Sequence, residues 1–459
     1  MSLHKDDLLN LVQQYNVPGP RYTSYPTAVQ FSEEFDKSEL EDNFKRRRES
    51  EKPLSLYIHI PFCFSLCWYC GCTKIITKDQ NRGDIYLDYL DKEMALVSKT
   101  THPKATLKQI HFGGGTPTFL DPKQIRRLGQ LIKTYFTLHN DVEFSVEIDP
   151  RRCSEEHIIA LAEIGCNRAS LGVQDTNEEV QKAIHRIQPF EQTAEVTKLL
   201  RKHGINSINF DLIYGLPKQS IRSFKKTIED VVRLEPDRFA IYSYAHIPSI
   251  MPSQKLLDEA DFPSTHNKLG MLVHAIEKLP YYGYSYIGMD HFAKESDELS
   301  KALKEGTLQR NFQGYSTHAE LEMIALGMSS ISQGPDLYCQ NDKDLNQYYS
   351  VLDDGKLPVK KILRLSEEDK IRKTVIMHVM CRGGINYSEL SAELGISFKD
   401  HFSNELENLK QLEADGLLLL TPKGFNITST GRLFLRNIAM VFDGYLTQSR
   451  HKAAYSKTV

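Results

Sequence analysis

The sequence predicts an α/β protein built around a parallel β-sheet. Between residues 53 and 245, six short runs rich in β-branched and aromatic residues alternate with amphipathic stretches of helical length. Strands separated by helices pair in parallel through right-handed crossovers. The 459 residues, 40% of them hydrophobic, suffice for a substantial core. Six units are fewer than the eight that close a barrel, and periodicity does not distinguish a curved sheet from a flat one.

The strand and helix predictions follow the chain in strict alternation. Each strand is a run of four to eight residues, and each helix carries apolar residues at helical spacing. The predicted strands are residues 56–60, 108–112, 143–148, 168–173, 207–213 and 239–244. The predicted helices are residues 83–98, 122–137, 154–164, 178–184, 190–203 and 220–234.

Composition divides the chain into four predicted parts: an N-terminal arm (1–52), the sheet unit (53–290), an extension with a linker (291–360) and a C-terminal domain (361–459). We expect helix and irregular segments over residues 246–360. Near the start of the last part, Ser366 and the acidic residues after it predict a helix N-terminus. The helices and the two short strands that follow resemble a winged helix-turn-helix. Balanced charge favours a lid or scaffold over a DNA reader.

The cysteine distribution is the strongest local signal. Four of the eight cysteines lie within ten residues, directly after the first predicted strand. The C-x3-C-x2-C spacing of Cys63, Cys67 and Cys70 suits three thiolates on one iron–sulfur cluster, with one iron left open. A closed zinc site that also uses Cys72 is an alternative, as are thiols without metal. Because one residue separates Cys70 from Cys72, a closed tetrahedron is disfavoured.

A glycine run ends the second predicted strand. Gly113-Gly-Gly-Thr-Pro-Thr118 lets the backbone approach a ligand closely and adopt positive φ angles. A simple tight turn is the alternative. Parallel sheets carry their chemistry at the carboxyl ends of the strands. We therefore expect the thiols and the glycine run to share one site.

These motifs resemble the radical S-adenosylmethionine superfamily. Further segments narrow the resemblance, over nearly the whole chain, to the family of oxygen-independent coproporphyrinogen III oxidases. They are Gly19-Pro-Arg-Tyr-Thr-Ser-Tyr-Pro-Thr27, Cys72, Val146-Glu-Ile-Asp-Pro150, Gly172-Val-Gln-Asp175, Asp211-Leu-Ile-Tyr-Gly-Leu-Pro217, Gly288-Met-Asp-His-Phe292 and Asn311-Phe-Gln-Gly-Tyr315. The resemblance implies a curved, open (β/α)6 partial barrel, with the N-terminal arm and a mostly helical, winged-helix-like C-terminal domain.

The resemblance also implies cofactors and a reaction. A [4Fe–4S] cluster would be held by Cys63, Cys67 and Cys70, and its open iron would take S-adenosylmethionine. In this family, the matching contact residues bind two molecules of S-adenosylmethionine. The 5′-deoxyadenosyl radical would take a hydrogen from the β-carbon of a propionate of coproporphyrinogen III, after which CO2 leaves. Two such steps give two vinyl groups and protoporphyrinogen IX. An external electron donor and an external acceptor are implied as partners.

Site residues follow from the same resemblance, position by position. The implied cofactor contacts are Tyr57, Tyr69, Gly114, Gly115, Thr116, Glu147, Gln174, Arg186, Asp211, Ala245 and Ile331. The candidates on the substrate side are Cys72, Arg21, Tyr22, Phe312 and Gln313. Arg21 is chosen because the substrate carries four carboxylates. A turn arginine and aromatic core residues are the structural alternatives.

Charge and hydropathy limit the other function classes. The formal net charge of −3 argues against bulk nucleic-acid binding, and acidic neighbours make the basic run 45–48 a predicted solvated helix face. No run approaches the roughly 20 apolar residues of a membrane span. We expect a cytoplasmic monomer with reduced thiols. A haem-binding or haem-delivery protein of the same superfamily is the second hypothesis, although such relatives usually lack the 19–27 segment and Cys72.

Overall fold

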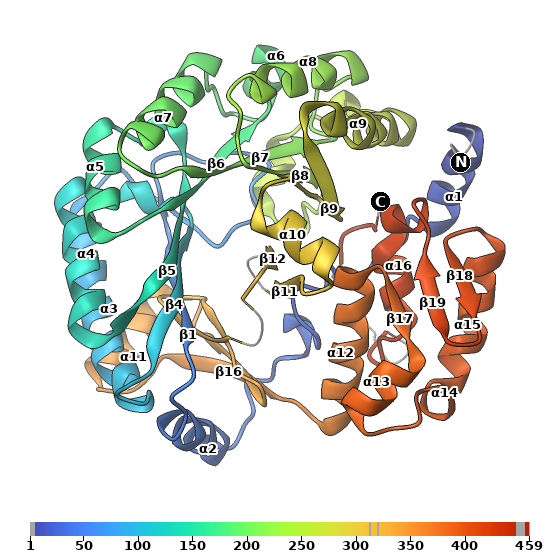
Figure 1. Ribbon diagram of the computed structural model, residues 1–459. Coiled ribbons are helices and arrows are strands. Elements are labelled where there is room, and N and C mark those ends of the chain that lie inside the picture. Colours follow the sequence, from blue (N-terminus) through green and yellow to red (C-terminus); the bar gives the residue numbers. More distant parts are fainter. Residues whose placement is uncertain (1–4, 312–313, 319–320, 447–454, 459) are drawn as a thin grey trace.

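A single twelve-stranded sheet organises the computed structural model, which describes residues 5–311, 314–318, 321–446 and 455–458. Six consecutive strands pair in parallel in the order of the sequence, as predicted. They are β1 (Leu54–Ile60), β4 (Thr106–Gly114), β5 (Thr137–Ile148), β6 (Arg168–Gln174), β7 (Ser207–Tyr214) and β8 (Arg238–Ser243). The sheet curves without closing, so the prediction of an open partial barrel is confirmed (Figure 1).

Both edges of the sheet extend further than predicted. A seventh parallel strand, β13 (Glu322–Leu326), pairs with β1. Antiparallel strands continue on both edges: β14 (Ile331–Gln333), β15 (Leu337–Asn341), β16 (Val359–Arg364), β10 (His291–Lys294) and β9 (Tyr284–Gly288). The expectation of helix and irregular segments over 246–360 was therefore wrong for these strands. They contain three to six residues each, too few for a periodicity to emerge. The proposed boundaries at 290 and 360 fall at β10 and inside β16, and the four-part division stays a prediction.

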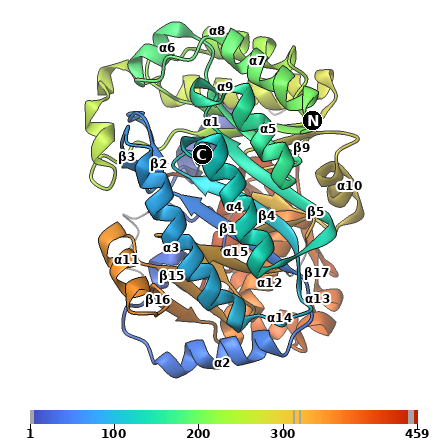
Figure 2. The same cartoon turned by 90° about the vertical axis from the view of Figure 1, so that its left-hand side faces the viewer.

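Helices cover the convex face of the sheet (Figures 1 and 2). They are α3 (Asn81–Val97), α4 (Pro122–Tyr135), α5 (Glu155–Ile164), α7 (Phe190–Lys202), α8 (Ile221–Val232) and α9 (Thr265–Lys278). Strand β7 illustrates the division of faces, because Ile208, Phe210 and Leu212 are fully buried. Each such burial stabilises the fold by roughly 1.5–3 kcal/mol. The alternate residues Asn209 and Asp211 therefore line the concave side.

The C-terminal region contains the predicted helices and two strands in the expected order, together with a strand, β17 (Gly384–Asn386), that was not predicted. It comprises α12 (Glu367–Arg382), β17, α13 (Tyr387–Leu394), α14 (Phe398–His401), α15 (Ser403–Ala414), β18 (Leu418–Thr421), β19 (Gly424–Ile427) and α16 (Leu435–Met440). The predicted N-cap is present, since Ser366 Oγ accepts a hydrogen bond from the Asp369 amide at 3.1 Å. Strands β17, β19 and β18 form a separate antiparallel sheet. This unit lies across the open side of the barrel from helices α3–α5 (Figure 1).

The basic run of the N-terminal arm, residues 45–48, departs in part from its prediction as a solvated helix face. It ends α2 (Lys37–Arg48), which follows α1 (Lys5–Tyr15) and the 19–27 segment. Arg47 is only 4% exposed. Its Nε lies 2.7 Å from Glu322 Oε1, and Arg46 Nη2 lies 2.7 Å from Glu322 Oε2. Lys45 and Arg48 are exposed, as a solvated face requires. Arg47 is not, because β13 brings a carboxylate to it from 275 positions away.

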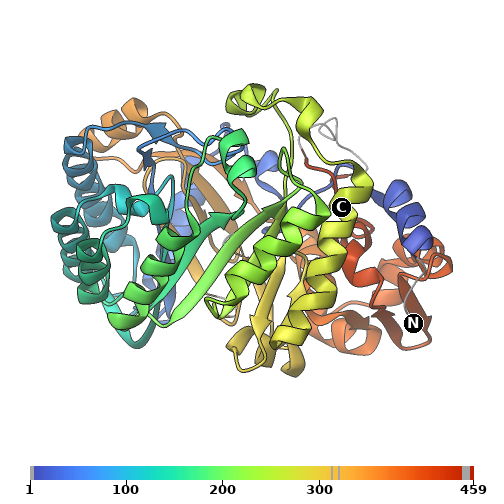
Figure 3. The ribbon, with the colours of Figure 1, turned by 90° about the horizontal axis from the view of Figure 1, so that it is seen from above.

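The two ends of the chain are joined. Pro18 and Lys457 form an antiparallel bridge, and the Arg436 Nε donates to Pro20 O at 2.9 Å. Figure 3 shows both ends on the same side of the molecule. In the described part of the chain, no helix combines the length and apolarity that a membrane crossing requires.

Candidate active site

The cysteine loop is anchored at its base. It leaves β1 through β2 (Phe62–Cys63) and returns at β3 (Ile75–Ile76), which pairs with β2. The Ile75 amide donates to Pro61 O at 2.7 Å, and the Thr77 amide donates to Cys63 O at 3.0 Å. A loop closed in this way holds its thiols at the carboxyl end of the parallel sheet, where the sequence predicted the site.

Two arginines face the buried thiol of Cys67. Arg151 Nη2 lies 3.4 Å from the sulfur and Arg186 Nη1 lies 3.6 Å from it. Cys63, Cys67 and Cys70 are all free cysteines. Among the described residues, however, no three Cys, His, Asp or Glu side chains are already assembled around a metal position.

Cys72 differs from the other three cysteines of the loop. It is exposed, whereas Cys67 is buried and Cys63 and Cys70 are half-buried. A hydrogen bond between the two thiols lowers the pKa of Cys70 to about 6 and raises that of Cys72. Cys72 is therefore next to the three proposed ligands and more accessible than any of them.

Asp149 clamps both arginines. Its carboxylate accepts from Arg151 Nη2 at 2.6 Å and from Arg186 Nη2 at 3.1 Å. Burial would raise the pKa of Asp149, but the charge of Arg186 and the hydrogen bonds from Arg151 lower it to about 2. Arg186 Nη2 also donates to Gly172 O at 2.7 Å, while its Nε is buried without a hydrogen-bond partner. The clamp thus holds a guanidinium with an unused donor beside the thiols.

The glycine run packs directly on the strand that carries the thiols. The Gly115 amide donates to Ile60 O at 2.8 Å, and the Thr116 amide donates to Phe62 O at 2.9 Å. A Cβ atom on Gly115 would lie 2.6 Å from Pro61 O. No side chain fits at this position, so close backbone contact, and not turn flexibility alone, explains the run.

A carboxylate and two aromatic groups lie beside the glycine run. Glu147 Oε2 accepts from the Gly114 amide at 3.2 Å, and Glu147 Oε1 lies 3.3 Å from His111 Nε2. The Tyr57 ring stacks on His111 with centroids 5.8 Å apart, and its hydroxyl lies 3.0 Å from His59 Nδ1. The structure therefore brings Tyr57, Gly114 and Glu147 together, as the resemblance implied.

The other expected cofactor contacts are spread over several elements of the barrel. Gln254 Nε2 donates to Tyr69 O and to Ala245 O, both at 3.1 Å. Gln174 ends β6 with a φ of 66°. Burial raises the pKa of Asp211 to about 7. Ile331 begins β14 and packs in a separate apolar cluster with Phe31, Tyr338 and Leu365.

The substrate-side candidates have different surroundings. Arg21 Nη1 pairs with Asp290 at 3.0 Å, beside a cavity of about 30 Å³. Tyr22 is 1% exposed and donates its hydroxyl to Asp443 at 2.9 Å, so it packs as a core residue. Phe312 and Gln313 lie outside the described residues.

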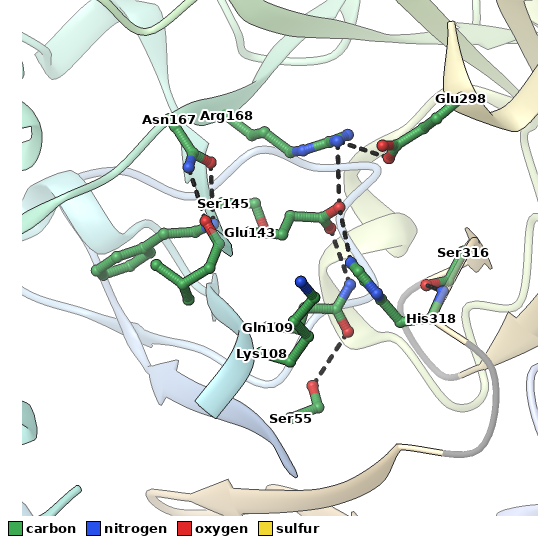
Figure 4. A network of polar contacts seen from close by, with 12 residues as sticks. Ser55, Lys108, Gln109, Glu143, Ser145, Asn167, Arg168, Glu298, Ser316 and His318 are labelled. Carbon is green, nitrogen blue, oxygen red and sulfur yellow. Dashed lines mark hydrogen bonds and ion pairs between the residues drawn. The ribbon is translucent and has the colours of Figure 1, made fainter. Parts of the chain in front are cut away.

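A network of polar contacts joins β4, β5 and β6 on the concave side of the barrel (Figure 4). Glu143 Oε2 lies 3.2 Å from Arg168 Nη2 and 3.5 Å from His318 Nε2. The Gln109 amide donates to the other Glu143 oxygen at 2.8 Å. Arg168 also pairs with Glu298 at 2.5 Å. The network therefore places paired charges inside the barrel.

Several site residues escaped the sequence reasoning. Asp149 and Arg151 follow a strand end directly, a position that could have identified them. The indole of Trp68 stacks on His185 with centroids 5.2 Å apart, and Gln254 spans two loops. Trp68, His185 and Gln254 had no local signal, because their partners lie far away in the sequence.

Comparison with known proteins first defines the class. Residues 57–231 match the Radical SAM superfamily, and residues 365–434 match the HemN C-terminal domain. The thiol loop and the glycine run both lie in the first of these regions. The chain is thus a radical S-adenosylmethionine protein with an appended C-terminal domain.

Full-length relatives then identify the family. The chain is 44% identical to the oxygen-independent coproporphyrinogen III oxidase of Pseudomonas aeruginosa, and the match covers 98% of each chain. It is 48% identical to the Helicobacter pylori J99 protein of the same name, over 94% of this chain and 95% of that one. The solved coproporphyrinogen III oxidase of Escherichia coli superposes with a TM-score of 0.91 at 42% identity, covering 95% of this chain and 98% of that one. The chain belongs to the family of oxygen-independent coproporphyrinogen III oxidases.

Proposed function

We propose that this chain converts coproporphyrinogen III to protoporphyrinogen IX in haem biosynthesis. The reaction removes CO2 from two propionate side chains and leaves two vinyl groups, without oxygen. The observation that carries the proposal is the anchored three-thiol loop beside the glycine run, in a chain that matches named oxidases over 98% of its length. That coverage also favours the oxidase over a haem-delivery protein.

The residues present fit the cofactors of this family. Three free thiols lie on one anchored loop, two guanidinium groups face one of them, and Arg186 Nε has no partner. Cys63, Cys67 and Cys70 would hold the [4Fe–4S] cluster, with one iron open to S-adenosylmethionine. When bound, the cluster supplies the electron that cleaves S-adenosylmethionine and generates a hydrogen-abstracting radical.

The chain's own part is to bind, orient and exclude water. Arg186, held by Asp149, is suited to a carboxylate, and Glu147 to a cationic amine or a ribose hydroxyl. Gly114, Gly115 and Thr116 supply close-lying backbone. The other cofactor contacts we propose, for two S-adenosylmethionine molecules, are Tyr57, Tyr69, Gln174, Asp211, Ala245 and Ile331.

On the substrate side we propose Cys72 and Arg21. Cys72 is exposed next to the cluster ligands, and Arg21 lies beside Ser243 at the carboxyl end of β8. Because Arg21 Nη1 already contacts Asp290, a substrate carboxylate would share this guanidinium. Cytoplasmic location, a monomeric state and an external electron donor and acceptor complete the proposal.

The test is anaerobic turnover by the reconstituted chain. Coproporphyrinogen III, S-adenosylmethionine and a chemical reductant are supplied, and vinyl porphyrins are measured by chromatography after oxidation. We expect product only when all three are present. Tight stoichiometric haem binding without any vinyl product would refute the oxidase and support haem delivery. Arg21→Ala should weaken substrate affinity by about 1.5–3 kcal/mol and leave S-adenosylmethionine affinity unchanged.

A further inference from the structure

A large cavity opens at the amino-terminal end of the barrel, far from the thiols. It has a volume of about 630 Å³ and lies between α2, the starts of β1 and β13, the short strand β11 (Gln309–Asn311) and α12. This volume is typical of sites for drug-sized ligands. Leu54, the first residue of β1, lines it. The seven residues of β1 separate it from the cysteine loop by roughly 20 Å.

The charge of the cavity is one-sided. Seven lysines and arginines line it, against two glutamates. Arg46 and Arg47 are paired with Glu322, and Lys370 is paired with Asp336. Four cations remain for which no carboxylate partner is found among the described residues. They are Lys52, Arg310, Lys373 and Arg382.

Arg310 is the decisive residue. It is 8% exposed, and its Nε and Nη1 are buried without a hydrogen-bond partner. Its guanidinium lies over the Tyr315 ring at 4.8 Å from the centroid. A buried guanidinium with unused donors is costly unless an anion joins it. Among the described residues no carboxylate pairs with Arg310, which lines the cavity, so a ligand carboxylate beside it would offset part of this cost.

Apolar side chains form part of the lining between the cations, beside polar ones such as Gln333 and Thr374. Leu54, Leu308, Met323 and Met377 are among the lining residues. The side chain of Lys373 extends over the Tyr338 ring at 5.3 Å. A small inorganic anion would leave these apolar side chains in contact with water. The combination of apolar side chains and four available cations suits a flat apolar molecule with several carboxylates.

The cavity and the thiols lie at opposite ends of the barrel strands. His318 lines the cavity, and its Nε2 lies 3.5 Å from Glu143, a member of the network of paired charges in Figure 4. An occupant of the cavity is therefore separated from the cysteine loop by the length of β1. An occupant would therefore bind at a second site and not inside the reaction centre.

We propose that this cavity is a second binding site for a tetracarboxylate tetrapyrrole, which holds one substrate-class molecule apart from the reaction centre. The four unpaired cations match the four carboxylates, and Arg310 makes the central contact. The identity of the ligand class rests on the proposed function, whereas the existence of a polycarboxylate site rests on the cavity alone.

The experiment measures binding of coproporphyrin III, the oxidised and unreactive form, to the anaerobically reconstituted full chain. Calorimetry should give two molecules per chain. Arg310→Met and Lys373→Met should each weaken one of the two by at least tenfold, while Arg222→Met, at an exposed position on α8, should keep both. Protoporphyrin IX, with two carboxylates, should bind this site at least tenfold more weakly.

Two results would overturn the proposal. One is a stoichiometry of one in the wild type, whether or not binding depends on Arg310. The other is binding that depends on Arg310 but that millimolar phosphate shows as strongly as coproporphyrin III does. Iron content and near-ultraviolet circular dichroism report folding, and Lys373→Met serves if Arg310→Met does not fold. Failure of the proposed function would appear separately, as absence of vinyl product from the wild type.

Discussion

Replacing Asp149 by Asn should destabilise the fold far more than a typical loss of a surface charge. The folded-state pKa of Asp149, about 2, lies below its ordinary 3.8. The difference corresponds to about 2.5 kcal/mol of preference for the charged carboxylate. Because the pKa is lowered on folding, this stabilisation is complete well above pH 4 and is lost as the pH falls through about 2. A measurement at pH 7.5 therefore captures all of it.

The variant also leaves the two arginines without their counterion. The side chain of Arg186 is 7% exposed and that of Arg151 is 14% exposed. Removing one partner of a buried ion pair costs about 3–5 kcal/mol, although Asn retains one hydrogen-bond acceptor. We expect a loss of about 2.5–4 kcal/mol in unfolding free energy. With an unfolding entropy of roughly 1 kcal/mol/K for 459 residues, the melting temperature should fall by about 3 °C.

Anaerobic differential scanning calorimetry of the cluster-free chain provides the assay. The matched control is Asp88→Asn, which removes an exposed Asp–Arg pair with Arg127. Exposed pairs contribute about 0–1 kcal/mol, so this control should shift the melting temperature by less than about 1 °C. Equal shifts for the two variants would refute the argument that Asp149 is a buried counterion.

Three further predictions address the thiols, a buried acid and the glycine run. The wild type should hold about four iron atoms per chain, and Cys63→Ala should abolish the cluster. Cys72→Ala should retain iron and S-adenosylmethionine binding but lose porphyrin product. Loss of iron from Cys72→Ala would make that cysteine a ligand. Burial raises the pKa of Glu93 from 4.5 to about 7. The unfolding free energy of the wild type should therefore fall relative to that of Glu93→Gln as the pH rises from about 5 to 8, by up to roughly 3 kcal/mol. Unfolding free energies that change in parallel with pH in the two proteins would contradict this. Gly115→Ala would place its Cβ 2.6 Å from Pro61 O, so it should lower stability by about 1–3 kcal/mol and weaken S-adenosylmethionine binding. Unchanged stability would exclude the close contact with Pro61 as the reason for the glycine, and unchanged binding in equilibrium dialysis would exclude Gly115 as a cofactor contact.

The elements that the sequence predicted well are those with local signals. The strands β1 and β4–β8 are long enough to show their pattern, and helices of 6 to 17 residues separate them. The thiol loop and the glycine run follow two neighbouring strands, so parallel pairing alone predicts that they meet. The Gly115 amide hydrogen bond to Ile60 O is the direct outcome.

The features that escaped prediction depend on distant partners. Arg186 meets Asp149 across 37 positions, and Arg47 meets Glu322 across 275. Neither residue of a pair carries a local mark of its partner. The strand β13 contains only five residues, and its apolar run fits a buried helix equally well. Its place beside β1 follows from sheet topology and not from its own sequence.

The joined ends of the chain impose an order on assembly. The 19–27 segment is made early, yet Arg436, which holds Pro20, follows 416 positions later. At a synthesis rate of roughly 5–20 residues per second, the segment waits on the order of tens of seconds for its partner. The cysteine loop and all seven parallel strands leave the ribosome during that interval. The contact between Arg436 and the 19–27 segment can therefore form only after the whole thiol loop and the sheet that anchors it have been synthesised.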